Sequence, residues 1–431
     1  MRIPNRPGAA GGMLTAVPGT APLASAVAGL ASAMRFLTRR RPVLVLLSLA
    51  AAALAAIAVP VAASASTGGS RVVGHVYVND NTARTNTIGA FDRHADGTLT
   101  PEAGSPFAAG GAGTAPSGLA SQGALQISPG GRFLIAVDAG SNQISVLRIK
   151  PGGSLMLVAH SVVSSGGVLP VSIAIHGDLV YVANAGSSAT VGPNYTGFRL
   201  RPNGRLEPIA GSTVTLPPVG SLPAQPGDVL FNGDGTKLVG TEVGTSLIDS
   251  FTVGSDGRLT AAPGSPFAAQ GLGPFGSEFR PTNPDQLFVS NAHNVGAGTG
   301  TVSAFSDSAD GTLTSIGASP FADLQTAPCW VEISHDGQFL FTVNTGSGEI
   351  SRYSINPDGS LVRLGSTPVG ATGGVGAVDA RLSPDGAYLF VDESKIGAVG
   401  AFAVSGGNLT ELGSSPTSLP AGVAPAGIVV T

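Results

Sequence analysis

Short apolar runs alternate with tight-turn residues along the chain from Arg71 to its end. The clearest example is Leu382 to Phe390, in which two apolar runs flank Pro384-Asp385-Gly386. Proline presets the φ angle of a turn, and Asp and Gly tolerate the tight or left-handed positions that follow. The pattern predicts a β-hairpin, and the same hairpin recurs along the chain.

The recurring hairpins are spaced by roughly 47 to 58 residues, which is within or just above the period of propeller blades. The second strand of each hairpin begins near Val76, Phe133, Val180, Leu238, Leu287, Phe339 and Tyr388. Each is followed by a third apolar strand such as Ile350–Tyr353, a second tight turn such as Asp358-Gly359, and a fourth strand. A four-stranded antiparallel meander must stack on its neighbours to bury both faces. Seven such units predict an all-β, seven-bladed β-propeller.

The first repeat lacks an inner strand of its own, because Arg71 leads almost directly into Val76. The other end of the chain supplies a candidate, since Pro425–Thr431 matches the inner-strand pattern of Pro328–Ser334. We therefore expect the C-terminal strand to pair into the first blade and close the ring.

The composition agrees with many short strands and turns. The 431 residues include 63 glycines and 32 prolines, yet 42% are hydrophobic, which argues against disorder. A net charge of -4 with 11% charged residues offers no basic surface for nucleic acid. The single cysteine, Cys329, excludes an intramolecular disulfide framework. We expect a monomer with no nucleic-acid partner.

The N-terminal segment has the parts of a secretory signal peptide. Basic residues follow Met34, an apolar run extends from Val43 to Val59, and a small-residue site ends at Ala65. We predict cleavage after Ala65 and a secreted protein. The alternative is an uncleaved membrane anchor. Residues 1–33 are then a disordered extension, or the chain starts at Met34, and residues 71–431 form the propeller.

Alignment of the repeats places an acidic or amide residue at the end of every second strand. In a propeller these strand ends meet at one face, around the mouth of the central channel. The column consists of Asp80, Asp138, Asn184, Glu242, Asn291, Asn344 and Glu393. Asn and Asp also cap strand ends by bonding to nearby backbone, which is the structural alternative. That alternative is weaker for Glu242 and Glu393, because glutamate is a poor turn former.

A second column lies at the start of the inner strands and contains Asp228, Trp330 and Asp379. Asp228 shares a blade with Glu242, and Asp379 shares the last blade with Glu393. Each pair can raise the pKa of one carboxyl and provide a general acid near neutral pH. Each can equally hold a hydrated cation through oxygen ligands. No spacing in these columns matches an established Ca²⁺ loop, so no metal site is predicted.

Three further residues are candidates by position. Arg280 and Arg381 lie along inner strands, where an ordinary salt bridge or a place on the sheet face is the alternative role. His293 lies in the loop from Asn291 to Thr301, on the channel-mouth face, and is the one histidine that we single out as a site residue. That loop and the loop from Ala185 to Tyr195 rise over the same face, as binding loops do.

The repeat combines Leu-Ser-Pro-Asp-Gly-x-x-Leu-x-Val, as at 382–391, with Ile-x-x-Phe, as at 88–91, and Asp-Gly-x-Leu, as at 96–99. This pattern resembles the lactonase family of seven-bladed propellers. That family includes 6-phosphogluconolactonase-like and carboxy-muconate-cyclising members, and the resemblance covers about Arg71 to Thr431. Glu242 matches the glutamate of the family's Asn-Glu pair. The family's Arg-His pair is missing, because Gly227-Asp228, Phe275-Gly276 and Cys329-Trp330 stand at the matching places.

Two functions remain open at this point. The resemblance implies a secreted lactonase-like enzyme without a cofactor, acting on a sugar lactone or related cyclic ester. In it Glu242 is the acid or base, and Asp228 assists together with Arg280 or Arg381. The other function is a non-catalytic extracellular propeller that binds a small polar molecule, a glycan or a protein. Its predicted ligand contacts are Glu393, Asp379, Asp138, Asn184, Asn291, His293 and Asn344.

Overall fold

The computed structural model describes residues 70–187, 191–370, 374, 376–420 and 424–431. The chain divides into two units, Met1–Ser66 and Thr67–Thr431. The predicted extension (1–33) and signal peptide (34–65) lie outside the described residues. Within the part that is described, no helix has the length and apolar character needed to cross a membrane.

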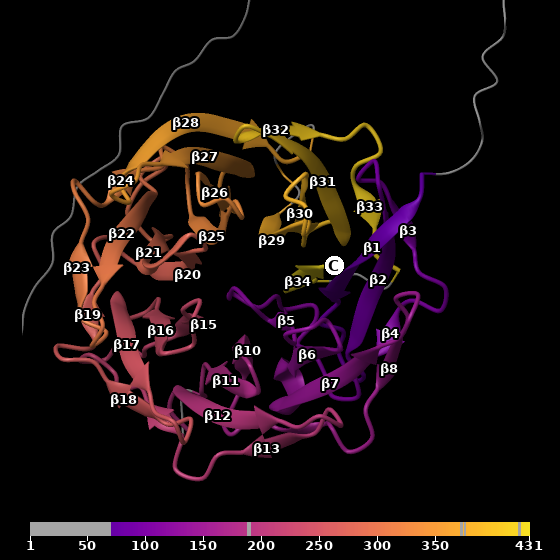
Figure 1. Cartoon of the computed structure of the whole chain (residues 1–431), viewed down its shortest axis with the longest axis horizontal. Helices are drawn as coiled ribbons and strands as arrows, with labels where there is room; N and C mark the ends of the chain where they lie inside the picture. Colours follow the sequence, from indigo (N-terminus) through magenta and orange to yellow (C-terminus); the bar gives the residue numbers. More distant parts are fainter. Residues whose placement is uncertain (1–69, 188–190, 371–373, 375, 421–423) are drawn as a thin grey trace, which may run out of the picture. The chain divides into compact units, whose positions relative to one another are not determined.

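The described residues form seven antiparallel sheets, and the inner strands of successive sheets contact each other all the way round a central channel (Figure 1). The prediction of a seven-bladed β-propeller is confirmed. Within each blade four strands follow one another from the channel outwards, and in all blades but the sixth a short fifth strand also pairs with the third. Blade 1 contains β34 (Ile428–Val430), β1 (Val72–Asn79), β2 (Thr87–His94), β3 (Leu99–Pro101) and β4 (Phe107–Ala108).

Blade 2 contains β5 (Leu125–Ile127), β6 (Phe133–Asp138), β7 (Gln143–Ile149), β8 (Leu155–Leu157) and β9 (Val163–Ser164), with a 3-10 turn η1 (Ala139–Ser141) after β6. Blade 3 contains β10 (Pro170–His176), β11 (Leu179–Asn184), β12 (Asn194–Leu200), β13 (Leu206–Pro208) and β14 (Val214–Thr215). Blade 4 contains β15 (Pro226–Phe231), β16 (Lys237–Glu242), β17 (Leu247–Val253), β18 (Leu259–Ala261) and β19 (Phe267–Ala268).

Blade 5 contains β20 (Pro274–Arg280), β21 (Asn283–Asn291), β22 (Thr301–Asp307), β23 (Leu313–Ser315) and β24 (Phe321–Ala322). Blade 6 contains β25 (Pro328–Ile333), β26 (Phe339–Asn344), β27 (Glu349–Ile355) and β28 (Leu361–Pro368). Blade 7 contains β29 (Ala377–Leu382), β30 (Tyr388–Glu393), β31 (Ala398–Ser405), β32 (Asn408–Glu411) and β33 (Thr417–Ser418).

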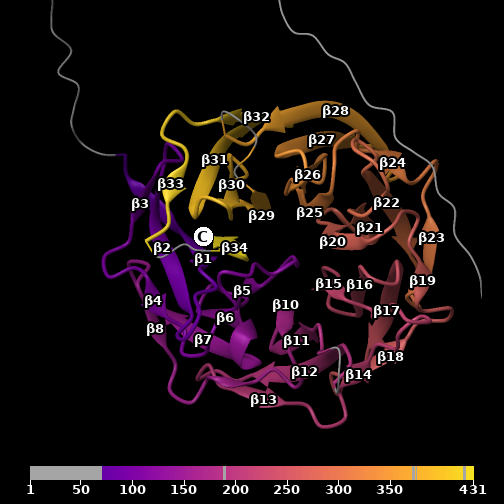
Figure 2. The ribbon, with the colours of Figure 1, turned by 180° about the vertical axis from the view of Figure 1, so that it is seen from behind.

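The C-terminal strand closes the ring, as predicted. β34 pairs antiparallel with β1, and Val429 stands opposite Tyr77. Ile428 and Val429 are buried, and the backbone N–H of Thr431 donates to the carbonyl of His75 at 2.8 Å. The first blade is therefore built from both ends of the propeller sequence (Figure 2).

Neighbouring blades also interlock through the turn between the third and fourth strands. A Cβ atom added at Gly407 of blade 7 would lie 2.3 Å from the Phe339 ring of blade 6. The φ angle of Gly407 is +76°, so glycine suits both the left-handed turn and the close approach of the neighbour. The same contact joins Gly97 of blade 1 to Tyr388 of blade 7 across the closure.

Candidate functional site

The amides at the ends of the second strands are held inside their own blades. Asn184 donates through Nδ2 to Asn194 Oδ1 at 3.0 Å. Asn291 and Asn344 donate in the same way to Ser303 Oγ and Ser351 Oγ, at 2.8 and 2.9 Å. All three asparagines are buried. The structure thus gives their side chains partners on the third strand, and their role in ligand contact remains a prediction.

Asp138 links two blades. Its Oδ2 accepts a hydrogen bond from Ser145 of its own blade, and its Oδ1 accepts from Asn86 Nδ2 of blade 1 at 2.9 Å. Burial raises the pKa of Asp138 above its ordinary value, against these two donors. Asp80, the first member of the column, accepts a hydrogen bond through Oδ2 from Thr87 Oγ1 of its own blade at 2.7 Å.

Glu242 belongs to a buried carboxyl pair that the sequence interpretation missed. Its partner is Asp249 on the third strand of the same blade, whose Oδ2 accepts a hydrogen bond from Tyr195 of blade 3 at 3.0 Å. Burial, with repulsion from Glu242, raises the pKa of Asp249 to about 8, so the two carboxyls share a proton near neutral pH. The sequence feature that could have indicated this pair is Asp249 itself, because it is a charged residue within the apolar third strand.

Glu393 occupies the matching place in blade 7. Its side chain lies against Gly400, where a Cβ atom would come within 2.5 Å of Glu393 Oε1. Neither carboxylate oxygen has a hydrogen-bond partner among the described residues, and burial raises its pKa to about 7. The predicted pair of Glu393 with Asp379 is not joined by any hydrogen bond between described residues.

Asp228 is buried on the inner strand β15, and no hydrogen bond joins it to Glu242 among the described residues. Its Oδ2 accepts from the backbone N–H and the hydroxyl of Ser277, at 3.1 and 2.8 Å, and its Oδ1 accepts from Ser172 Oγ at 3.1 Å. Burial raises the pKa of Asp228 to about 7, although these donors favour the ionised form. Asp228 therefore ties the inner strands of blades 3, 4 and 5 together.

The chain ahead of β5 crosses the channel. This channel segment, Ser121 to Gly123, reaches toward the middle of the ring in Figure 1. Gln122 donates through Nε2 to Ser277 O of blade 5 and accepts through Oε1 from Val331 N of blade 6, both at 3.0 Å. Trp330 donates through Nε1 to Ser121 O at 3.0 Å, and Gly123 N donates to Asp379 Oδ2 at 3.4 Å. No alternation of apolar residues marked this segment in the sequence.

Arg381 lies on the side of the channel segment away from the mouth. Its Nη1 forms an ion pair with Glu332 Oε2 at 2.9 Å, and Glu278 Oε2 lies 3.9 Å from the same atom. Burial raises the pKa of Asp379 on the same strand to about 6, although the positive charge of Arg381 opposes this shift. A pocket of about 400 Å³ next to Arg381 and Glu332 opens beside the hairpin turns of His335 and Pro384.

Arg280 makes its contacts at the same far side. Its guanidinium donates to Gly337 O at 2.8 Å, Gln286 Oε1 at 2.9 Å and Asn356 O at 2.9 Å. Burial lowers the pKa of the guanidinium below its ordinary value. Arg280 thus connects blades 5 and 6, and these hydrogen bonds give its guanidinium a structural role. The structure does not bring Arg280, Arg381 and Glu242 together.

The channel mouth holds a pocket of about 370 Å³ above the channel segment. Its lining includes Ala185, Val243 and His293. Ala185 and Val243 directly follow the end of a second strand, and His293 lies two residues after one. The remaining walls are Thr114, Ser117, Gly118, Leu119, Ala120, Leu169, Val171, Gln225, Pro226 and Phe275. Of the predicted site residues, His293 lines this pocket.

The fold and the mouth pocket define a seven-bladed β-propeller with a small-molecule-sized pocket over its channel. The family model "Lactonase, 7-bladed beta-propeller" matches residues 82–193 and 278–427, which is more than half of the chain. The chain therefore belongs to the lactonase family of seven-bladed β-propellers, as the sequence resemblance indicated.

Solved structures with the same fold are distant in sequence. A putative 6-phosphogluconolactonase from Bacteroides uniformis is 21% identical, with a TM-score of 0.65 over 84% of this chain and 100% of the other. A periplasmic gluconolactonase from Pseudomonas aeruginosa is 18% identical, with a TM-score of 0.65 over 83% of this chain and 99% of the other. At such identities the likeness is one of fold. Among curated proteins, none matches the chain.

Proposed function

We propose that the chain is a ligand-binding propeller whose mouth pocket holds one small, largely apolar molecule. The observation that carries the proposal is the pocket lining. Leu119, Leu169, Val171, Val243 and Phe275 give the wall a largely apolar surface, and no Asp, Glu, Lys or Arg is among the described lining residues.

The chemistry of this lining favours an apolar ligand over a sugar or a phosphate. Burial of apolar ligand surface contributes about 25 cal/mol per Å², whereas a phosphate needs a cationic partner such as arginine. Gln225 and His293 can bond to one polar edge of the ligand. A lactone that carries an alkyl chain has both features, and we propose it as the ligand class.

Binding is tested by calorimetry with γ-lactones of increasing alkyl length and with gluconolactone as the polar comparator. We expect affinity to rise with alkyl length and gluconolactone to bind weakly. Ala120 is exposed and lines the pocket, so Ala120→Trp should fill the pocket and abolish binding. The matched control, Ala261→Trp, lies on the exposed outer strand β18 and should bind as the unmodified chain does. Tight binding of gluconolactone with no binding of alkyl lactones would overturn the proposal.

Hydrolysis of the bound lactone is the second candidate, and the position of His293 on the pocket wall favours it. A neutral imidazole can take a proton from water as the water attacks the lactone carbonyl, and the Gln225 amide can donate to the oxyanion that forms. The imidazolium then returns this proton to the ring oxygen, which leaves as the alcohol of the hydroxy acid.

Acid release from the same lactones tests hydrolysis. Loss of turnover in His293→Gln with binding retained would support a base at the mouth. Loss in Glu242→Gln instead would support the carboxyl predicted from the sequence, which lies one residue before Val243 of the pocket wall. If no lactone releases acid, hydrolysis is refuted and ligand binding is the proposed function that stands.

Secretion is part of the proposal and rests on the N-terminal sequence pattern. N-terminal sequencing of protein recovered from the culture medium tests it. We expect a mature chain that begins at Ser66, and a start well before Ser64 would contradict cleavage.

A further inference from the structure

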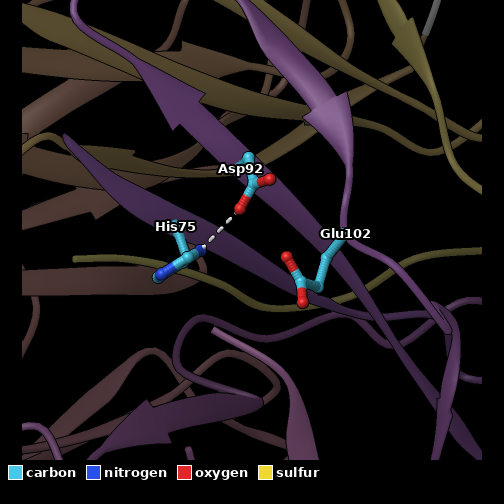
Figure 3. Close-up of side chains that lie close together, drawn as sticks. All are labelled: His75, Asp92 and Glu102. Atoms are coloured by element: carbon cyan, nitrogen blue, oxygen red, sulfur yellow. Dashed lines mark ion pairs between the residues drawn. The ribbon is translucent and has the colours of Figure 1, made fainter. Parts of the chain in front are cut away.

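One histidine and two carboxylates gather on blade 1, away from the channel. One ligand atom from each of His75, Asp92 and Glu102 lies within 4.8 Å of the other two (Figure 3). His75 Nδ1 is 3.2 Å from Asp92 Oδ1. The trio is partly open, since the side chains of His75 and Asp92 are 16% and 27% exposed.

Adjacent strands hold the three side chains in place. His75 on β1 stands directly opposite Asp92 on β2 in the antiparallel register. Glu102 follows the end of β3, and its backbone N–H donates to Ala90 O at 2.9 Å. The turn of blade 2 packs on the imidazole, because a Cβ atom at Gly153 would lie 2.2 Å from His75 Nδ1. A ligand set on rigid strands needs little reorganisation to bind an ion.

The other blades provide an internal comparison, because the strand register identifies the matching positions. The counterparts of His75 are Phe133, Leu179, Lys237, Gln286, Phe339 and Tyr388. The counterparts of Asp92 are Arg148, Arg199, Thr252, Ser306, Ser354 and Ala403.

The position of Glu102 departs most clearly from the repeat. In five other blades the residue with the same backbone hydrogen bond is apolar: Val158, Ile209, Ala262, Ile316 and Leu412. A carboxylate at this site is therefore not required by blade packing. Among the described blades, blade 1 alone combines three potential ligands at these three positions.

The donor set suits a divalent transition-metal ion. Zinc binds imidazole nitrogen and carboxylate oxygen at about 2.0–2.2 Å, which places neighbouring donors about 3.4 Å apart in a tetrahedron. The observed 3.2 Å between His75 Nδ1 and Asp92 Oδ1 is close to this spacing. Two carboxylates would balance the charge of the ion, and solvent can complete its coordination.

We propose that His75, Asp92 and Glu102 form a binding site for one divalent transition-metal ion, of which Zn²⁺ is the best match. The site lies at the closure of the ring, because the backbone N–H of His75 donates to Thr431 Oγ1 at 2.9 Å. An ion bound to β1, β2 and the end of β3 braces the strand to which β34 pairs. Metal binding therefore stabilises the closed propeller.

The experiment uses the full chain without a polyhistidine tag, first treated with a chelator. Zn²⁺, Mn²⁺ and Ca²⁺ are each titrated by calorimetry and by thermal unfolding. We expect one Zn²⁺ per chain, a higher thermal midpoint with Zn²⁺, and weaker binding of Ca²⁺ because imidazole is a poor ligand for it. His75→Gln and Glu102→Gln should each weaken Zn²⁺ binding by at least about tenfold. The control, His335→Gln, removes an exposed histidine of the β25–β26 turn and should bind Zn²⁺ normally.

Imidazole resonances in NMR spectra locate the ion independently of stability. The chain has six histidines, and we expect one signal, absent in His75→Gln, to shift on addition of Zn²⁺. Equal Zn²⁺ affinity in His75→Gln and the unmodified chain would overturn the proposal, as would a shift confined to other histidines. If His75→Gln does not fold, Glu102→Gln and the NMR titration of the unmodified chain still decide the question.

Discussion

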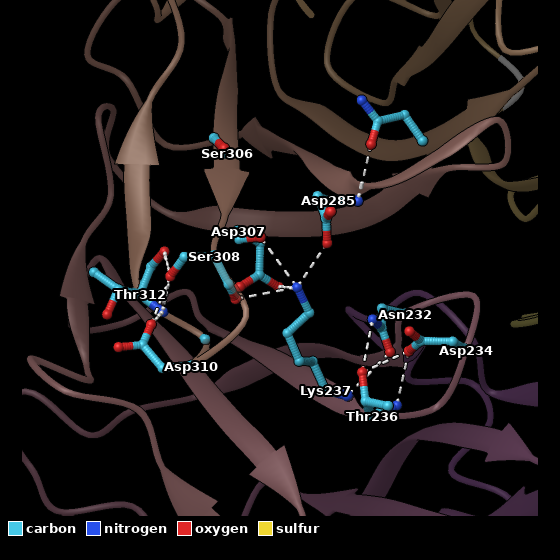
Figure 4. A network of polar contacts seen from close by, with 12 residues as sticks. Asn232, Asp234, Thr236, Lys237, Asp285, Ser306, Asp307, Ser308, Asp310 and Thr312 are labelled. Carbon is cyan, nitrogen blue, oxygen red and sulfur yellow. Dashed lines mark hydrogen bonds and ion pairs between the residues drawn. The ribbon is translucent and has the colours of Figure 1, made fainter.

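Removal of the amino group of Lys237 tests how blades 4 and 5 are held together. Lys237 begins β16, and its Nζ donates to Asp285 Oδ1 at 2.9 Å and to the carbonyl of Asp307 at 3.0 Å (Figure 4). The same Nζ forms an ion pair with Asp307 Oδ2 at 3.4 Å. The side chains of Lys237 and Asp307 are 4% and 0% exposed, whereas that of Asp285 is 64% exposed.

We expect Lys237→Met to destabilise the propeller by about 3–5 kcal/mol near pH 8, because the variant leaves the Asp307 carboxylate buried and unpaired. The cost depends on pH. Burial raises the pKa of Asp307 to about 6, even though Lys237 lowers it. Without Lys237 this pKa rises further, so near pH 5 the carboxyl is protonated and the variant loses only hydrogen bonds, at about 1 kcal/mol each.

The sign follows from proton linkage. The native Asp307 has a higher pKa than the unfolded carboxyl, so the native state binds more protons between about pH 4 and 6. The stability that this proton contributes is lost as the pH rises through 6. In Lys237→Met the loss is larger and extends to higher pH.

Urea midpoints from far-UV circular dichroism, measured near pH 5 and near pH 8, provide the assay. Asp285→Asn is the matched control and should cost no more than about 1 kcal/mol, because the side chain of Asp285 is exposed. Adding Asp307→Asn to Lys237→Met should restore most of the stability near pH 8. Equal destabilisation of Lys237→Met at both pH values would refute the reasoning, as would an effect no larger than that of Asp285→Asn.

Two further predictions concern the ring. Deleting residues 425–431 removes β34, and we expect the thermal midpoint to fall sharply, because Ile428 and Val429 each contribute about 1.5–3 kcal/mol by burial; a deletion variant that melts like the full chain in calorimetry would contradict closure. Gly407→Ala should cost about 1–3 kcal/mol more than Gly130→Ala in urea unfolding. Both glycines have positive φ, but only at Gly407 would the added Cβ atom meet a neighbouring blade within 4 Å. Equal costs would show that turn conformation alone requires Gly407.

The number of blades, their hairpins and the closing strand could be predicted from the amino-acid sequence alone. These features depend on local chemistry that recurs, namely apolar strands of suitable length and turns such as Pro384-Asp385-Gly386. The inner-strand pattern of the C-terminus could be matched to Pro328–Ser334 for the same reason. Strand pairing within a blade connects near neighbours in sequence, so a local pattern is enough to predict it.

Which side chains meet depends on the tertiary structure. The column that ends at Glu393 was found by alignment, but the packing of strands turns its members toward third-strand residues, as with Glu242 and Asp249. The packing also brings Gln122 into contact with blades 5 and 6, more than 150 residues away.

The trio on blade 1 likewise depends on tertiary packing and not on a local sequence pattern. The three residues have no ligand spacing in the sequence, because 16 residues separate His75 from Asp92 and nine separate Asp92 from Glu102. Their approach to one another depends on the register of three strands. The repeat predicts where each strand lies, whereas the contacts between side chains from different strands and blades depend on register and ring packing, which no local pattern encodes.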